Sequence, residues 1–306
     1  MPEDRRNPVV SSASRPFISL NTLDSFRDRF LVRDPRGRSA RPAMQAGRRG
    51  GESGFFLGDG ANLFITYRVR ASQGRRFAEA TGDENPIHRE GNIVPGAMTV
   101  SKILLPLEVL FPTFRIERLR IQFKQPSTYG ETARAFFSWR EVDGQVRVLT
   151  RVFQSSGLMA RCQVSGSLAE EPAAKKAPLL KGAGLDRIRS YFHALRIDSR
   201  AFLEQGGKPN YVYPLAFIAS LPSGEMVKSL SGQGGFLNSL CLDFSQSKRI
   251  PIGRKPEVLL EPSRLRATFR KIVTRITEGL DTYCHGFALV HPPVTPDSAS
   301  PPSSDG

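Results

Sequence analysis

The pattern of hydrophobic and polar residues contains two long apolar stretches, and each is followed by segments of alternating character. The first stretch opens with Val94-Pro-Gly-Ala-Met98 and stays apolar to about Leu110, which predicts a buried helix. Alternation and β-branched residues then predict strands over 114–124, 133–139, 146–153 and 158–168. A long apolar helix followed by long antiparallel strands predicts an α+β fold, in which the sheet wraps the helix.

The segments before this helix are less regular. A run rich in β-branched and aromatic residues predicts a strand over 63–69. Apolar residues at mixed spacing over 16–32 indicate a short helix on the core. Arginine and glycine dominate 33–54, which indicates a loop.

The order of elements repeats in the second half of the chain. A helix over 188–198 and an apolar helix from Pro214 to Leu230 precede four predicted strands, which lie over 236–245, 258–260, 265–276 and 283–290. Pro222 and Gly224 disfavour helix, so the second apolar helix is predicted to be kinked or split near Ser223.

This order predicts two units of the same architecture within one chain. We expect them at 16–169 and 183–290, joined by a linker at 170–182 that begins Glu-Glu-Pro. Polar composition predicts disorder at 1–15, and a Pro- and Ser-rich composition predicts it at 291–306.

Composition narrows the class of protein. The 306 residues are 39% hydrophobic and contain no apolar run of about 20 residues, so a globular protein without a membrane span is expected. The first residues lack the apolar segment of a secretory signal. Cys162, Cys241 and Cys284 are widely spaced and form no metal pattern or disulfide framework. We therefore expect a cytoplasmic location, no metal and no cofactor.

The net charge of +15 is the strongest compositional feature. Such a charge permits nucleic-acid binding, an anionic membrane surface or an acidic partner. An Arg-rich solvated surface is the simpler explanation. Because the sequence contains no helix-turn-helix, RRM or zinc pattern, no nucleic-acid partner is expected.

The candidate chemistry lies in the twelve residues from Phe77 to His88. A short helix ends at Gly82, and the following polar loop places Asp83 and His88 five residues apart. Pro86 stiffens that loop and disfavours helix at the residue before it. A carboxylate and an imidazole facing one cavity can hold a water and move its protons. Either residue alone is better explained by a helix cap and an Asx turn.

The string Gly-Asp-Glu-Asn-Pro-Ile-His, which ends at His88, closely resembles the signature of MaoC-like (R)-specific enoyl-thioester hydratases and dehydratases. The resemblance covers roughly residues 61–169. It implies a hotdog fold. Together with the repeated order of elements, this predicts a double hotdog, with an antiparallel sheet wrapped around two long central helices. It also implies that Asp83 and His88 activate the water that adds to, or leaves, C3 of an acyl thioester.

The resemblance assigns two further residues to substrate positioning. Gly96 stands where a glycine at a helix start commonly contacts the thioester carbonyl, and unpaired backbone N–H groups at a helix start can polarise that carbonyl. Asn85 of the motif is the second. The substrate implied is an acyl-CoA or an acyl carrier protein thioester, handled by a monomer (a pseudo-dimer of two units) or a homodimer.

The second unit departs from the motif. Laid on the first, it keeps Asp198 but has Arg200, Ala201 and Leu203 where the motif has Asn, Pro and His. A carboxylate without its imidazole cannot share two proton transfers, so this unit is expected to complete the sheet and wall the substrate tunnel. We expect ordinary polar or surface roles for His193, His285 and His291.

The first unit also departs from the family pattern. Only six residues separate His88 from Pro95, and Arg89 and Glu90 occupy the first positions after the histidine. This shortening leaves the mouth of the site and the choice of substrate open.

Several functions are compatible with these features. A hydro-lyase that interconverts (3R)-hydroxyacyl and trans-2-enoyl thioesters is the leading interpretation. The alternatives are a polyketide-pathway thioester isomerase or cyclase on the same site and a non-catalytic acyl-thioester-binding hotdog protein. A hotdog thioesterase is disfavoured, because that activity does not use this string.

Overall fold

The computed structural model describes residues 15–33, 44–142, 144–169, 183–205, 209–230, 235–245, 249–266 and 269–291. Apart from Arg15 and His291, the ends predicted to be disordered lie outside these ranges, and so does the predicted linker at 170–182.

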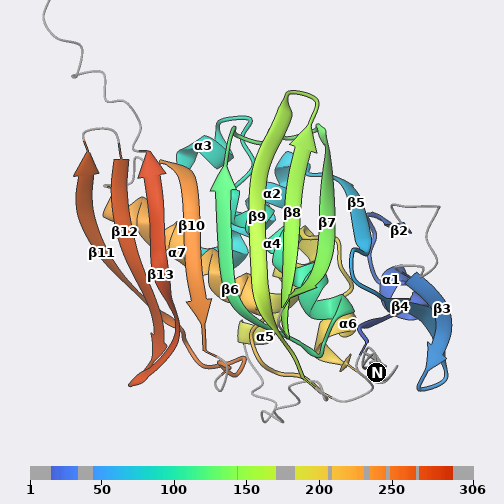
Figure 1. Ribbon diagram of the computed structural model, residues 1–306. Helices are drawn as coiled ribbons and strands as arrows, with labels where there is room; N and C mark the ends of the chain where they lie inside the picture. The colour runs from blue at the N-terminus through green and yellow to red at the C-terminus, as the bar shows by residue number, and fades with distance from the viewer. Residues whose placement is uncertain are drawn as a thin grey trace, which may run out of the picture.

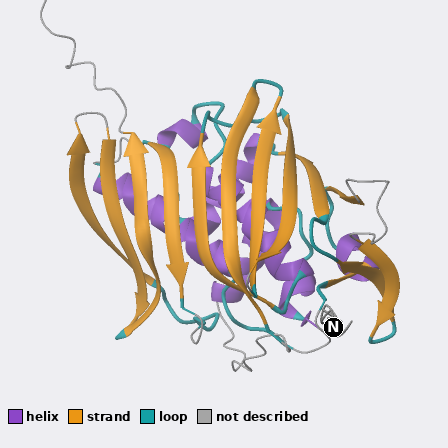
Figure 2. Ribbon diagram, viewed as in Figure 1, coloured by secondary structure: helices purple, strands orange, loops and turns teal. Residues whose placement is uncertain are grey.

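A ten-stranded antiparallel sheet forms one side of the molecule, and helices cover its inner face (Figures 1 and 2). In pairing order its strands are β11 (Glu257–Arg266), β12 (Phe269–Glu278), β13 (Asp281–His291), β10 (Phe236–Phe244), β6 (Phe114–Phe123), β9 (Gly157–Leu168), β8 (Gln145–Gln154), β7 (Thr132–Val142), β5 (Asn62–Arg68) and β2 (Arg29–Arg33).

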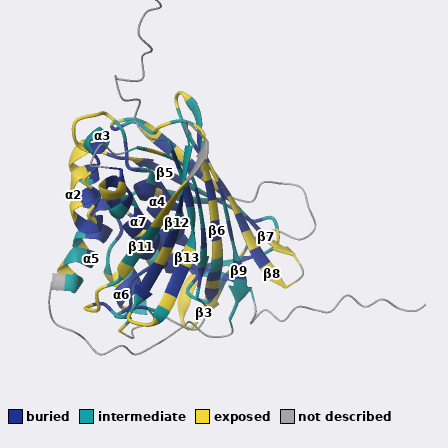
Figure 3. Ribbon diagram, turned by 90° about the vertical axis from the view of Figure 1, so that its left-hand side faces the viewer, coloured by how far each residue is buried: buried dark blue, intermediate teal, exposed yellow. Residues whose placement is uncertain are grey.

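Side chains alternate between the two faces of the sheet, as period-2 patterning requires. On β6, Leu119 and Ile121 are buried against the helices, while Arg118 and Arg120 are exposed on the outer face. Buried and exposed positions alternate along the strands in the side view (Figure 3). The alternation that predicted these strands therefore also defines the inner face.

Two long helices pack together beneath the sheet, α4 (Gly96–Leu110) and α7 (Leu215–Ser229). Every residue of α4 from Ala97 to Leu110 is buried, which explains why its sequence is apolar on all sides. Four shorter helices surround them, α2 (Ala71–Thr81), α3 (Pro86–Arg89), α5 (Ala183–Ala194) and α6 (Arg200–Leu203). None of the helices in the described ranges has the length and apolar character that crossing a membrane requires.

The order of elements is the same in both halves. The series α2-α3-α4-β6-β7-β8-β9 is followed by α5-α6-α7-β10-β11-β12-β13. Strands β6 and β10 pair antiparallel, with Leu240 opposite Ile121, so the two sets of strands form one continuous sheet. One sheet wrapped around two central helices is the double hotdog architecture that the sequence predicted.

The region before β5 differs from the prediction. Only α1 (Leu20–Asp24) is helical within 16–32, and it lies between β1 (Phe17–Ser19) and β2. The expected loop contains a hairpin of β3 (Met44–Arg49) and β4 (Glu52–Leu57), which pairs with β1. A Cβ at Gly54 would lie 2.1 Å from the carbonyl oxygen of Ile18, so this glycine permits close strand pairing.

Helix α7 is continuous from Leu215 to Ser229, so the predicted split near Ser223 is wrong. Pro222 lies inside the helix, just as Pro106 lies inside the equally long α4. Gly224 does not break the helix but permits a close contact. A Cβ there would lie 2.3 Å from the carbonyl oxygen of Gly82, so only glycine lets α7 approach the loop after α2 this closely.

Candidate active site

Local sequence shapes the loop that carries the two candidate acid–base residues. Helix α2 ends because Gly82 adopts a left-handed conformation with φ of 78°, which glycine tolerates without strain. Asn85 then caps α3, since its Oδ1 accepts a hydrogen bond from the backbone N–H of Ile87 at 3.2 Å. Pro86 occupies the first helical position, where it lacks only an N–H that would be unpaired anyway.

Asp83 is fully buried, and both of its carboxylate oxygens accept hydrogen bonds. Oδ1 accepts one from the backbone N–H of Asn85 at 3.2 Å, and Oδ2 accepts one from Ser223 Oγ at 2.7 Å. The same Oδ2 lies 3.9 Å from His88 Nε2. This separation is too long for a direct hydrogen bond, but one water or substrate hydroxyl beside both atoms can bond to each.

The environment of His88 determines which nitrogen is available for chemistry. Its Nδ1 lies 3.0 Å from the carbonyl oxygen of Ile93, which requires Nδ1 to carry the proton and donate it. Nε2 is then an unprotonated acceptor that faces Asp83. Burial lowers the pKa of His88, although the charge of Asp83 and the Ile93 carbonyl oppose this effect. The imidazole is therefore neutral near pH 7.

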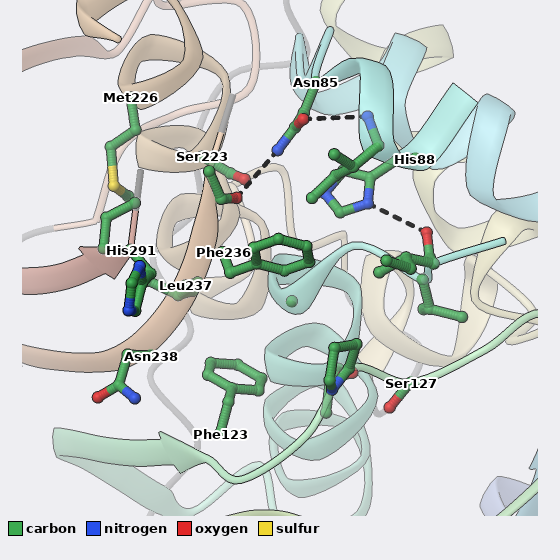
Figure 4. A pocket seen from close by; sticks show the side chains of 18 of the residues that line it. Asn85, His88, Phe123, Ser127, Ser223, Met226, Phe236, Leu237, Asn238 and His291 are labelled. Carbon is green, nitrogen blue, oxygen red and sulfur yellow. Dashed lines mark hydrogen bonds between the residues drawn. The ribbon is translucent and has the colours of Figure 1, made fainter. Parts of the chain in front are cut away.

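A cavity of about 450 Å³ adjoins this pair. Asn85, His88, Gly96 and Ser223 line it together with apolar walls. The close view shows Asn85, His88 and Ser223 beside Phe236 (Figure 4). These walls come from both halves of the chain and include Phe123, Met226, Val227, Leu230, Phe236 and Leu237. A mostly apolar cavity with a few polar groups at one place suits an acyl chain with one reacting centre.

Gly96 lies at the start of α4 and lines the cavity, as its predicted role requires. A Cβ at this position would lie 3.4 Å from Leu237 Cδ2 and from Phe123 Cζ. An alanine would therefore fit the empty cavity but narrow it at the helix start. Because backbone N–H groups at a helix start lack partners within the helix, this end of α4 can hold a developing negative charge.

Asn85 is close to the other site residues, but its amide is engaged by the protein. Its Nδ2 donates to the carbonyl oxygen of Gly235 at 3.2 Å, in addition to the cap that Oδ1 provides. Asn85 thus ties the loop to the second half of the chain. A direct role in positioning substrate stays a prediction.

Three residues that support the site were missed by the sequence analysis. Ser223 and Gly224 follow Pro222 directly, and nothing in the local sequence indicates that they contact the motif. Tyr129 donates a hydrogen bond to the backbone carbonyl of His88 at 3.2 Å. A Cβ at Gly74 would lie 2.0 Å from that tyrosine oxygen, so the glycine in α2 makes room for it.

In the corresponding loop of the second half, the carboxylate is paired with an arginine of the same loop. Asp198 forms an ion pair with Arg200 at 2.8 Å, and hydrogen bonds from Arg200 lower the pKa of this partly exposed carboxylate. Leu203, laid on the position of His88, is a buried apolar residue. This loop therefore offers a neutralised carboxylate and no imidazole.

The start of α7 is also occupied. Glu108, from the end of α4, accepts hydrogen bonds from the backbone N–H groups of Leu215 at 2.8 Å and Ala216 at 2.9 Å. Arg249 lies 3.4 Å away and balances its charge. Burial raises the pKa of Glu108, while Arg249 and the two amides oppose this shift. The start of α4, at Gly96, faces the cavity. The matching start of α7 is instead filled by the carboxylate of Glu108.

The remaining histidines lie apart from the Asp83–His88 pair, with one exception. His193 is near the surface beside Arg76, and His285 is exposed 4.0 Å from Asp243. His291 lines the cavity, where its ring packs edge-on against Phe269 at 4.7 Å.

Comparison with known proteins identifies the fold. No protein-family profile and no curated protein sequence matches the chain. Among solved structures, a MaoC-like dehydratase is 12% identical over 78% of this chain and 98% of its own, with a TM-score of 0.55. A MaoC-like dehydratase from Phytophthora capsici is 10% identical over 79% of this chain and 97% of its own, also with a TM-score of 0.55.

A longer protein shares the same architecture. The full-length peroxisomal multifunctional enzyme type 2 from Drosophila melanogaster is 15% identical over 76% of this chain and 48% of its own, with a TM-score of 0.52. At such identities the likeness establishes the fold alone. The chain has the double hotdog fold of MaoC-like dehydratases.

Proposed function

We propose that the protein is a hydro-lyase that interconverts a (3R)-hydroxyacyl thioester and a trans-2-enoyl thioester by syn addition or loss of water. One observation carries the proposal. Asp83 Oδ2 and His88 Nε2 lie 3.9 Å apart beside an apolar cavity, and the unprotonated nitrogen faces the carboxylate. This arrangement provides a nitrogen that can accept a proton and a carboxylate oxygen that can orient one water.

In the hydration direction, Asp83 and His88 hold the attacking water between them. As the water oxygen bonds to C3, Nε2 of His88 accepts one of its protons and the C2–C3 π electrons move toward C2 and the thioester carbonyl. C2 then takes a proton from the pair on the same face, so the protons balance and the addition is syn. Dehydration is the same path in reverse.

The start of α4 supports the proposal at the carbonyl. Electron density gathers on the thioester oxygen when water adds, and a helix start beside it stabilises that charge more than it stabilises the neutral substrate. Gly96 leaves space for the oxygen to approach the backbone. At the start of α7 in the second half, the equivalent backbone amides already bond to Glu108. We therefore propose that one site operates per chain.

The second half supplies walls and support in this proposal. We propose that residues 16–169 form a hotdog unit that carries the chemistry and that 183–290 form a degenerate unit that completes it. Met226 and Val227 of α7 and Leu230 just after it line the cavity, and Ser223 holds Asp83. The acyl chain then lies between the two central helices and the sheet, carried by coenzyme A or by an acyl carrier protein.

Mass spectrometry of the reaction products tests the proposal directly. The full-length protein is incubated separately with crotonyl-CoA and with a 3-hydroxyacyl carrier protein. A gain or loss of one water on either substrate supports a hydro-lyase, and the substrate that reacts identifies the carrier. A changed product of unchanged mass would indicate isomerisation or ring closure instead, and an unchanged substrate in both incubations would contradict the proposal.

A further inference from the structure

The outer face of the sheet carries a dense group of arginines that the proposed chemistry does not use. We define the arginine face as the exposed side chains of Arg120 on β6, Arg134 and Arg140 on β7, Arg147 and Arg151 on β8, and Arg161 on β9. These four strands are neighbours in the sheet, and the helices lie on the opposite side (Figure 1).

Like charges lie directly opposite each other on this face. Arg151 pairs in register with Arg161, and Arg140 pairs with Arg147. Directly opposite residues of the same charge destabilise a sheet, because their Cβ atoms are only about 4.5–5.5 Å apart. Within the described ranges, no carboxylate forms an ion pair with any member of the arginine face. The repulsion is therefore not relieved within the described protein, and a bound polyanion would relieve it.

Two acidic groups beside the arginine face are already engaged. Asp243 on β10 pairs with Arg118, which lies next to the arginine face on β6. Glu117 accepts a hydrogen bond from Ser167 Oγ at 2.8 Å. The uncompensated charge thus concentrates on the side of the sheet formed by β7, β8 and β9.

Aromatic side chains alternate with the arginines. Phe136 lies opposite Arg151, and Phe153 lies opposite Arg134. Rings and guanidinium groups therefore alternate both along and across β7 and β8. The Phe136 ring contacts Phe153 edge-on at 5.6 Å and is 36% exposed. Rings that stack on bases, interleaved with arginines that contact phosphates, are the elements with which proteins hold single-stranded nucleic acid.

We propose that the arginine face binds single-stranded nucleic acid, independently of the acyl-thioester cavity. Four strands at about 4.8 Å spacing make a face wider than the roughly 12 Å major groove, so the sheet cannot enter a duplex. A second copy of the chain would present the same positive charge. A protein partner would need a larger apolar centre, whereas the exposed large apolar residues on these four strands are Phe136, Val142 and Leu149.

This proposal departs from the expectation that no nucleic acid is bound. That expectation rested on the lack of a known sequence module, and the arginine face has no such signature. Its members are spread from Arg120 to Arg161 along the chain and form one surface only when four antiparallel strands pair.

Fluorescence anisotropy with a labelled 20-nucleotide oligo(dT) or oligo(U) tests the proposal on the full-length protein. We expect binding that weakens steeply with salt, because log K falls by about 0.7 per log unit of salt for each phosphate contacted. The double variant R151E/R161E should weaken binding at least about tenfold and reduce the salt slope. The variant F136A should weaken binding about tenfold with little change in slope, since it removes stacking rather than charge.

The matched control is R75E/R189E, which changes net charge equally at two exposed arginines on α2 and α5, on the opposite side of the sheet from the arginine face. It should bind nearly as tightly as the unmodified protein. Several results would overturn the proposal: no binding at low salt, an equal loss in the control, or F136A binding as tightly as the unmodified protein. Tighter binding to phosphatidylserine vesicles or to polyglutamate than to either oligonucleotide would also overturn it. Thermal melts of each variant verify folding.

Discussion

Ser223 donates a hydrogen bond to Asp83 across 2.7 Å, although 140 positions separate the two residues along the chain. The serine lies on α7, in the half without an acid–base pair, and the aspartate follows α2. Gly224 beside it permits this approach, because any larger residue would collide with the Gly82 carbonyl. The second half therefore holds the reactive carboxylate in place as well as walling the cavity.

Removing that hydroxyl should lower turnover more than binding. We expect S223A to reduce kcat about tenfold, because a hydrogen bond to a charged group contributes roughly 1.5–3 kcal/mol. KM should change little, and S223T should recover most of the rate. Steady-state kinetics on an enoyl thioester measure both constants. The control is S220A on the same helix, where the hydroxyl donates only to the Phe217 carbonyl, and an equal loss there would refute the role of Ser223.

The pH dependence of hydration should reflect the buried imidazole. Burial lowers the pKa of His88, and the reaction needs unprotonated Nε2. The rate should therefore hold at neutral pH and fall only as pH drops through a value below the ordinary histidine pKa of about 6.5. A profile of kcat/KM against pH measures this limb, and H193A should leave it unchanged. An acid limb above about 6.5 would contradict the assignment.

The carboxylate of Glu108 should matter for stability. The variant E108A leaves two buried amides and Arg249 without their partner, which we expect to cost about 3 kcal/mol of the free energy of unfolding. Urea denaturation measures this change. The comparison variant E225A breaks an exposed pair with Lys228 and should cost less than about 1 kcal/mol. Similar costs for both variants would show that the buried carboxylate is not a structural cap.

The apolar cavity should favour acyl chains longer than crotonyl. Each buried CH₂ contributes about 0.8 kcal/mol, so kcat/KM should rise with chain length until the cavity is filled. The variant V227F places a ring in that space and should shift the preference to short chains. Competition among enoyl-CoA substrates of increasing length measures both effects. A rate that falls steadily beyond crotonyl size in the unmodified protein would contradict this use of the cavity.

Sequence patterns predicted the central part of this fold because burial and patterning agree there. Helix α4 is apolar on all sides and fully enclosed, and β6 alternates between two distinct environments. The β3–β4 hairpin was missed because β3 is polar and mostly exposed, and β4 reaches the core only at its end, where Leu57 is buried. The uninterrupted course of α7 was missed because Gly224 is required by a contact distant in sequence, not by the helix itself.

The candidate site was predictable where its parts are local. A short polar loop fixes the spacing of Asp83 and His88, so a string of seven residues could indicate the pair. The supports come from elsewhere in the chain. Ser223, Tyr129 and Glu108 act through contacts that only the packed helices and sheet create, and no local spacing reveals them. For the same reason, the arginine face becomes visible only once the strands are in register.

In the proposed reaction, Asp83 and His88 move the protons of one water. The most direct measurement is the rate of water addition to an enoyl thioester by purified, folded H88A and D83N, with D198N as the matched change in the second half. We expect losses of about 10²–10⁴-fold for each of the first two and a nearly unchanged rate for D198N. More than about a tenth of the original rate in H88A, or a comparable loss in D198N, would contradict it.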